Sequence, residues 1–238
     1  MGLARTLRTS IVPYDVPTFR ERLVEAGQRF LSIDLRVDGG SYSISDSGAG
    51  KGASEGGDVT WFESWGEHWT VQVTDFNVGN DTNSTSIATL TSDSDSDSNK
   101  GFEGVIDTGT TLLLIPETQT TAYYHAIPSA LYDPASSMWL FPCVQSASLP
   151  DLQLMISGAY AAIVPGEFLD FGSIDDHPGG GRADSPEEMC YGGVQSSEGL
   201  GVEAILGDVF LKSQLVVLDL EDGRVGFAKK DTTNVGSV

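Results

Sequence analysis

Short runs of apolar residues, bounded by polar turn-formers, recur along most of this 238-residue chain. The clearest runs are Phe30 to Val37, Trp69 to Val73, Leu152 to Ile156 and Gln214 to Leu218, with Gly, Ser, Asp and Asn between them. Runs of this length with such boundaries predict β-strands. Helical patterns are fewer and shorter. We therefore expect a mostly β protein with few short helices.

Three segments carry helix signals: Pro17 to Ala26, Pro116 to His125 and Asp208 to Ser213. The first has a proline near its first turn and Gly27 directly after its end, which are typical start and stop residues. The acidic low-complexity run TSDSDSDSNK, from Thr91 to Lys100, predicts a loop. We expect that loop to be free of metal, although an acidic run could in principle bind calcium.

The run VIDTGTTLLLIP, from Val105 to Pro116, places one carboxylate in a polar turn between apolar flanks. The flanks predict two buried strands, so the residues after Asp107 must form the turn that joins them. Glycine in that turn allows close backbone approach, and threonine hydroxyls can orient and stabilise an ionised carboxylate. Taken alone, the pattern equally fits an ordinary strand-turn-strand with Asx-turn chemistry.

A second segment, AILGDVFLKSQLVVLDLEDGRVGFAKK from Ala204 to Lys230, resembles the C-terminal signature of the pepsin-like aspartic proteases. In that family an apolar-apolar-Gly step, here Ile205 to Gly207, passes beside the catalytic loop. The segments CVQSASLPDLQLMISGAYAAIVPGEF and CYGGVQSSEGLGVEAILGDVFLKSQ match in order and are most similar to the fungal secreted branch typified by aspergillopepsin and penicillopepsin. The resemblance runs from about Val16 to Lys230 and implies the pepsin-like acid protease fold.

Pepsin-like enzymes have two lobes, and each lobe supplies one Asp-Thr-Gly loop to a pair of aspartates that share a water. This chain shows one such loop. The tract VPTFRERLVEAGQRFLSIDLRVDGGSYSI, Val16 to Ile44, resembles the end of the first lobe. The resemblance therefore implies a remnant of the N-terminal lobe and inter-lobe strands over residues 1–57, a C-terminal catalytic lobe over 58–230, and a tail over 231–238.

The resemblance also implies roles for single residues. Asp107 would be one member of the catalytic dyad, Thr110 would hold its outer oxygen, and Thr108 would brace the two loops against each other. The substrate would run along the backbone of Gly109, the hydroxyl of Thr111 and two apolar side chains that border its pockets. The full set is Thr108, Gly109 and Thr110 for support of the dyad, and Gly109, Thr111, Leu114 and Ile205 for substrate binding.

A second triplet, Asp46-Ser47-Gly48, resembles a catalytic loop less well. It is followed by the glycine-rich residues 48–52 where an apolar strand is needed, and it lies too close in sequence to Asp107 for a lobe to come between. We interpret Asp46 as part of a solvent-exposed loop.

The two cysteines, Cys143 and Cys190, show no CxxC spacing and no neighbouring histidine, which disfavours a metal or redox site. The resemblance implies that they form a disulfide, which would indicate an oxidising compartment. Glycosylation sequons at Asn80 and Asn83 also indicate such a compartment. The first residues show no signal-peptide core. We expect a secreted or vacuolar full-length protein whose signal, propeptide and first lobe lie upstream of Met1.

The formal charge of −21 disfavours binding to nucleic acid or to an anionic membrane, because phosphates would be repelled. It suits an acid environment, where carboxylates lose their charge, although simple solubility explains it equally well. No stretch is long and apolar enough to span a membrane. The sequences GAGKGAS around Lys51 and GLGVEA from Gly199 are interpreted as turns, so we expect no nucleotide, other cofactor or metal.

Three hypotheses of function stay open. The favoured one is an aspartic endopeptidase that acts at acid pH on polypeptides and needs its missing N-terminal lobe. The second is an inactive pepsin-like lobe that binds peptides. The third is a protease in which a second copy of this chain supplies the other aspartate.

Overall fold

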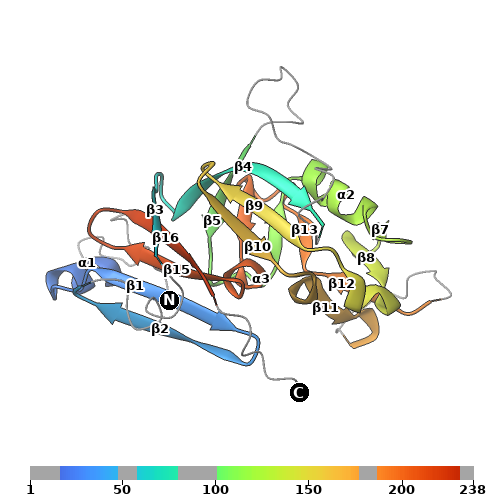
Figure 1. Ribbon diagram of the computed structural model, residues 1–238, viewed down its shortest axis with the longest axis horizontal. Coiled ribbons are helices and arrows are strands. Elements are labelled where there is room, and N and C mark those ends of the chain that lie inside the picture. The colour runs from blue at the N-terminus through green and yellow to red at the C-terminus, as the bar shows by residue number, and fades with distance from the viewer. Residues whose placement is uncertain (1–16, 48–57, 80–100, 177–186, 231–238) are drawn as a thin grey trace. The chain divides into compact units, whose positions relative to one another are not determined.

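The computed structural model describes residues 17–47, 58–79, 101–176 and 187–230 (Figure 1). Contacts divide the chain into one unit of residues 1–71, 105–107 and 211–238 and a second of residues 72–104 and 108–210. The lobe boundary that we expect at residue 57 falls in a segment outside the described residues, as do the tail and both sequons, so these expectations stay predictions.

The first unit is a single antiparallel sheet with the strand order β2-β1-β15-β16-β3, preceded by one helix. Its elements are α1 (Phe19–Glu25), β1 (Phe30–Arg36), β2 (Gly39–Ser45), β3 (Thr60–Glu63), β15 (Gln214–Asp219) and β16 (Arg224–Lys229). Strand register aligns Ile33 with Val216 and Val216 with Phe227, and all three side chains are buried. This apolar row forms part of the core. It reaches the sheet edge at Tyr42, which pairs with Ile33 and is exposed.

Helix α1 begins with a capping box. The Thr18 side chain accepts a hydrogen bond from the Glu21 N–H at 3.2 Å, and the Glu21 carboxylate accepts one from the Thr18 N–H at 2.6 Å. These bonds satisfy two N–H groups that a helix start leaves without partners. The backbone hydrogen bond from Thr18 is the main reason that the pKa of Glu21 lies below its ordinary value.

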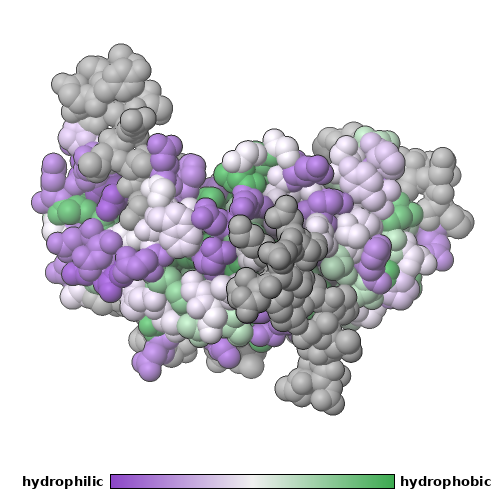
Figure 2. Space-filling model, turned by 90° about the horizontal axis from the view of Figure 1, so that it is seen from above, coloured by the Kyte–Doolittle hydropathy of each residue, from purple (hydrophilic) through white to green (hydrophobic). Residues whose placement is uncertain are grey.

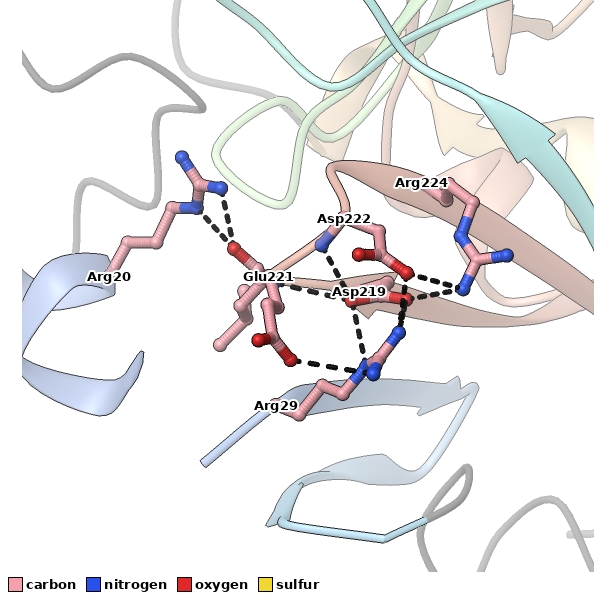
Figure 3. A network of polar contacts seen from close by, with 7 residues as sticks. Arg20, Arg29, Asp219, Glu221, Asp222 and Arg224 are labelled. Carbon is pink, nitrogen blue, oxygen red and sulfur yellow. Dashed lines mark hydrogen bonds and ion pairs between the residues drawn. The ribbon is translucent and has the colours of Figure 1, made fainter. Parts of the chain in front are cut away.

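A charged cluster surrounds Asp219 at the end of β15, as Figure 3 shows. The Asp219 side chain is fully buried, and its Oδ2 lies 3.0 Å from Arg29 Nη2 and 2.7 Å from Arg224 Nη2. Its Oδ1 accepts the backbone N–H of Glu221 and of Asp222, which closes the turn into β16. Burial alone would raise the pKa of Asp219. The hydrogen bonds from Arg29 and Arg224 outweigh burial and hold that pKa below its ordinary value.

Lys230 is a second buried charge of the first unit, with a side chain that is 7% exposed. Its Nζ donates to the carbonyl oxygens of Leu35, Leu211 and Lys212 and lies 3.1 Å from Asp34 Oδ1. Burial lowers the pKa of Lys230 to about 8, against the opposing effect of Asp34. The ammonium group thus joins β1 to Leu211, the last residue of α3 (Asp208–Leu211), and to Lys212.

The second unit contains a seven-stranded sheet with the order β10-β9-β4-β5-β14-β6-β13 and a four-stranded sheet with the order β11-β12-β8-β7. The strands of the first sheet are β4 (Thr70–Val78), β5 (Phe102–Ile106), β6 (Leu113–Ile115), β9 (Leu152–Ile156), β10 (Tyr160–Val164), β13 (Val194–Ser196) and β14 (Ala204–Leu206). Those of the second are β7 (Leu131–Asp133), β8 (Met138–Pro142), β11 (Asp170–Ser173) and β12 (Met189–Gly192). The helices are α2 (Glu117–His125), α3 and three 3-10 turns, η3 (Cys143–Ser148), η4 (Gly166–Leu169) and η5 (Ile174–Asp176).

Helix α2 packs on β13, and its Tyr124 side chain contacts Trp139 of β8. The Tyr124 ring stacks on Trp139 at 4.9 Å between centroids, and its hydroxyl donates to the Val194 carbonyl at 2.6 Å. A Cβ at position 192 would lie 1.6 Å from the Tyr124 hydroxyl oxygen. Gly192 is therefore required for this helix to lie so close to the strands.

The disulfide implied by the resemblance is present and joins Cys143 at the start of η3 to Cys190 in β12. A backbone hydrogen bond of 2.9 Å from the Cys143 N–H to the Glu188 carbonyl lies beside it. The disulfide thus joins the two ends of a chain segment that contains β9, β10 and β11.

The surface agrees with the acidic composition. Hydrophilic residues predominate on the face drawn in Figure 2, and hydrophobic residues show only in separate small areas. Asp46 and Ser47 are exposed directly after β2, as we expected for a solvent loop. Among the described residues, no helix is long and apolar enough to cross a membrane. The expectation of a mostly β chain with few helices is confirmed.

Candidate active site

The two strands predicted around Asp107 are present as β5 and β6. Thr108 and Gly109 form an exposed turn between them, and Asp107 is half-buried at the end of β5. The residue before it is fixed by a 2.8 Å hydrogen bond from the Ile106 N–H to the Trp69 carbonyl. The carboxylate therefore follows a buried strand residue directly, in a position that water reaches.

The loop after the turn is fixed by α3. The N–H groups of Asp208 and Val209 donate to the carbonyls of Thr110 and Thr111 at 2.8 and 3.0 Å. The first N–H groups of a helix have no partner within the helix, so this loop satisfies them. Thr110 and Thr111 are thereby held through their backbone carbonyl groups.

Gly207 passes directly beside this loop. A Cβ at position 207 would lie 2.3 Å from the carbonyl oxygens of both Thr110 and Leu112. Such distances exclude any side chain, so glycine is required by close approach of two backbone segments. The apolar-apolar-Gly step therefore lies where the resemblance implied, against the loop that follows Asp107.

Leu114 and Ile205 face each other in the antiparallel pair of β6 and β14. Both are half-buried, whereas their neighbours Leu113, Ile115 and Leu206 are fully buried. Because paired residues of adjacent strands share a face, the two half-buried side chains form one apolar area on the accessible face of the sheet. This is the arrangement expected of residues that border a substrate pocket, although their role stays a prediction.

The structure also contains a pocket that sequence reasoning missed. We call it the acidic pocket, and its volume is about 590 Å³. Its walls include Glu117, Glu198 and Glu203, together with apolar and hydroxyl residues of the same segments. The sequence GLGVEA was correctly interpreted as a turn, with Gly199 and Gly201 at φ values of +83° and +77°. The glutamates on either side of that turn were the signal that could have revealed the pocket.

Among the described residues, no group of three or more His, Cys, Asp or Glu side chains lies close enough to hold a metal ion. Asp107 itself offers a half-buried carboxylate directly before the exposed turn of Thr108 and Gly109. A carboxylate of this kind can accept a proton from water or stabilise a charge.

The sheet order and the Asp-Thr-Gly turn beside Gly207 define the pepsin-like aspartic proteinase fold. Residues 36–230 match the family model described as "Eukaryotic aspartyl protease". The chain belongs to that family.

Similar proteins come from fungi. The aspartic protease pepA of Arthroderma otae is 34% identical over 236 residues, which are 96% of this chain and 54% of that protein. Aspergillopepsin-1 of Aspergillus oryzae is 45% identical over 137 residues, which are 58% of this chain and 30% of that protein. The chain spans about half the length of the relatives that match nearly all of it.

The crystal structure of the aspartic proteinase from Irpex lacteus has the same fold. It superimposes with a TM-score of 0.67 at 21% identity and covers 95% of this chain and 66% of that one. The similarity supports the fold described above.

Proposed function

We propose that this chain supplies one catalytic aspartate, Asp107, to an aspartic endopeptidase that cleaves polypeptides at acid pH. The observation that carries the proposal is the Asp107-Thr108-Gly109 turn, which is followed by a loop that Gly207 and α3 hold through backbone contacts. An ordinary turn between two strands would not require a glycine at position 207.

The reaction is hydrolysis of a peptide bond by water. Two nearby carboxylates cannot both ionise, so they share one proton, which is established behaviour in pepsin-like dyads. The ionised member accepts a proton from the water as it attacks the carbonyl carbon, and the protonated member donates to the carbonyl oxygen.

Residues around Asp107 would orient the reacting groups. Thr108 and Thr110 would support the dyad, and Gly109 and Thr111 would bind the extended peptide backbone. Leu114 and Ile205, which share one accessible face, would receive an apolar side chain next to the scissile bond.

The second carboxylate must come from elsewhere in the full protein. The relatives are about twice as long, which favours an N-terminal lobe in the same polypeptide over a second copy of this chain. We further propose a secreted or vacuolar location and glycosylation at Asn80 and Asn83. The disulfide supports an oxidising compartment.

Cleavage of an unfolded protein at acid pH by the purified chain tests these possibilities, with pepstatin and with the Asp107→Asn variant. The matched control is Asp46→Asn, because Asp46 lies in an exposed Asp-Ser-Gly triplet. Activity that only Asp107→Asn and pepstatin abolish would show that two copies form the dyad. If the chain is folded but inactive, two hypotheses remain: a two-lobed protease and a lobe that only binds peptides. Adding the N-terminal lobe distinguishes them, because only the protease would then become active.

A further inference from the structure

Helix α3 has hydrogen-bond partners at both of its ends. At its start, its first two N–H groups donate to carbonyls of the loop after Asp107. At its other end, the carbonyls of Leu211 and Lys212 accept hydrogen bonds from Lys230 Nζ at 2.9 and 3.3 Å. One short helix thus has the loop of the candidate active site at its start and a buried lysine at its end.

Lys230 satisfies carbonyl groups that the end of a helix leaves without partners. The last carbonyls of a helix have no N–H partner within the helix, and they carry a partial negative charge. An ammonium group has three hydrogens and a positive charge, so it suits such carbonyls. Lys230 also donates to the Leu35 carbonyl in β1. The same ammonium group therefore anchors the end of α3 to the sheet of the first unit.

Charged groups of β1 hold Lys230 in place. Asp34 Oδ1 lies 3.1 Å from Lys230 Nζ, and the other carboxylate oxygen of Asp34 accepts a hydrogen bond from Arg36 Nη2 at 3.1 Å. The Lys230 side chain is only 7% exposed, so water cannot readily replace these partners. Lys230 is therefore a donor with a fixed position.

Apolar packing of α3 does not by itself fix the orientation of its backbone. The side chains of Val209, Phe210 and Leu211 are buried, with at most 3% exposed. Hydrophobic burial is not directional, whereas a hydrogen bond requires a narrow range of distances and angles. The apolar side chains therefore keep α3 in the core, and the hydrogen bonds at its two ends set the directions of its N–H and carbonyl groups.

The shortness of α3 allows a change at one end to affect the other. Its four residues span about 6 Å at the rise of an α-helix. An isolated turn is unstable in water, because forming it fixes several dihedral angles in exchange for one hydrogen bond. Helix α3 therefore depends on its partners. Without those at its end, its first N–H groups would hold the carbonyls of Thr110 and Thr111 less firmly.

We propose that Lys230 is a positioning residue for the candidate active site, because it fixes the end of α3 and α3 in turn fixes the loop after Asp107. The inference rests on the proposed function of that loop. The ammonium group would take no part in the reaction itself. Its role would be to maintain the loop geometry that the reacting carboxylate needs.

Amide hydrogen exchange of the chain, followed by NMR, tests the inference without requiring cleavage. The amides of Asp208 and Val209 report on the bonds to the loop. The Ser157 amide, which donates to the Gln72 carbonyl at 2.9 Å, serves as a reference elsewhere in the second unit. In Lys230→Met we expect the first two amides to exchange about tenfold faster, with little change at Ser157.

The matched control is Lys229→Met, because Lys229 is the neighbouring lysine and is exposed. It should leave all three amides unchanged. Unchanged exchange at Asp208 and Val209 in Lys230→Met would overturn the proposal, and so would an equal increase at Ser157, which would indicate only a loss of overall stability. If the methionine variant does not fold, Lys230→Gln keeps an N–H donor and provides the same comparison with a smaller expected increase.

Steady-state kinetics provide the second readout. The chain is fused behind the N-terminal half of aspergillopepsin-1 of Aspergillus oryzae, and peptide cleavage is measured at acid pH. Lys230→Met should lower kcat about fivefold and change KM by less than about twofold, because a misplaced loop affects the reacting groups more than binding. A change in KM alone would overturn the proposal. Faster exchange at α3 in a chain whose fusion never cleaves peptides would support the link from Lys230 to the loop and contradict the proposed protease function.

Discussion

The loop after Asp107 and the charged cluster around Asp219 are held by different kinds of interaction. Backbone carbonyls of Thr110 and Thr111 accept N–H groups of α3, and Gly207 allows the two segments to touch. The Asp219 cluster depends on the side chains of Arg29 and Arg224, which bind one buried carboxylate. The contacts described at the loop are thus made by the backbone, and those at the cluster by side chains.

The two regions therefore depend on different kinds of residue for their structure. At the loop, one glycine is decisive because two carbonyl oxygens occupy the space of its missing side chain. At the cluster, the decisive residue is the one buried charge that two guanidinium groups neutralise. The predictions below are arranged from the largest expected effect to the smallest.

Gly207→Ala should have the largest effect on stability. The added methyl group would meet two backbone oxygens that cannot move without breaking the bonds to α3, so we expect a loss of about 4 kcal/mol in the free energy of unfolding. Urea denaturation followed by fluorescence measures it. The control is Gly158→Ala, where φ is +69° and no atom lies within 4 Å of the added carbon. It should cost only about 1 kcal/mol, and a similar cost at both positions would contradict the close approach.

Asp219→Asn should cost about 2 to 3 kcal/mol, because it leaves Arg29 and Arg224 without their buried partner. The control is Asp222→Asn in the same cluster, whose side chain is 48% exposed and which should cost less than about 1 kcal/mol. Equal costs would show that burial of Asp219 is not decisive.

The same substitution should change the acid limb of the stability profile. The pKa of Asp219 is lowered by folding, so its contribution is complete above its unfolded pKa of about 4 and is lost as pH falls through the lower folded value. Asp219→Asn should therefore be less destabilising in strong acid than near neutral pH.

Lys230→Met should show a dependence of the same sign, but in the alkaline range. The folded pKa of Lys230 is about 8 and lies below its unfolded value of about 10.4, so the unfolded chain binds the extra proton between these limits. Stability relative to the methionine variant should rise across this window by on the order of 2 kcal/mol. Denaturation midpoints of both proteins at several pH values provide the measurement. A flat difference would mean that folding does not lower the pKa of Lys230.

Thr18→Ala should have the smallest effect, about 1 kcal/mol, because only the cap of α1 is lost. Thr18→Ser keeps the hydroxyl and should be nearly neutral. Thermal unfolding separates the two, and a matching loss in both would indicate that the methyl group of Thr18 matters more than its hydrogen bond.

The sequence predicts a strand or helix well where residues close together in the chain form its pattern. The alternation from Leu152 to Ile156 matches β9 fully, and the apolar run after Asp107 matches β6 to within a residue. Helix α2 begins one residue after the expected proline. In each case neighbouring residues determine the element.

Apart from the disulfide, which the resemblance implied, features that join distant segments were not predicted. Arg29 and Asp219 are separated by 190 residues, and nothing near either one indicates a partner. The acidic pocket likewise combines residues far apart in the sequence, such as Phe102, Glu117 and Glu203. Only the resemblance to a family pointed to Gly207, because a lone glycine has no distinctive local pattern.

The central claim is that Asp107 is one of two catalytic carboxylates, and the most direct measurement restores the missing half. The chain is fused behind the N-terminal half of a full-length relative such as aspergillopepsin-1 of Aspergillus oryzae, and cleavage of an unfolded protein is measured at acid pH. We predict pepstatin-sensitive activity that Asp107→Asn reduces by about a thousandfold or more and that Asp46→Asn leaves unchanged. An active fusion whose Asp107→Asn variant keeps its activity would contradict the claim.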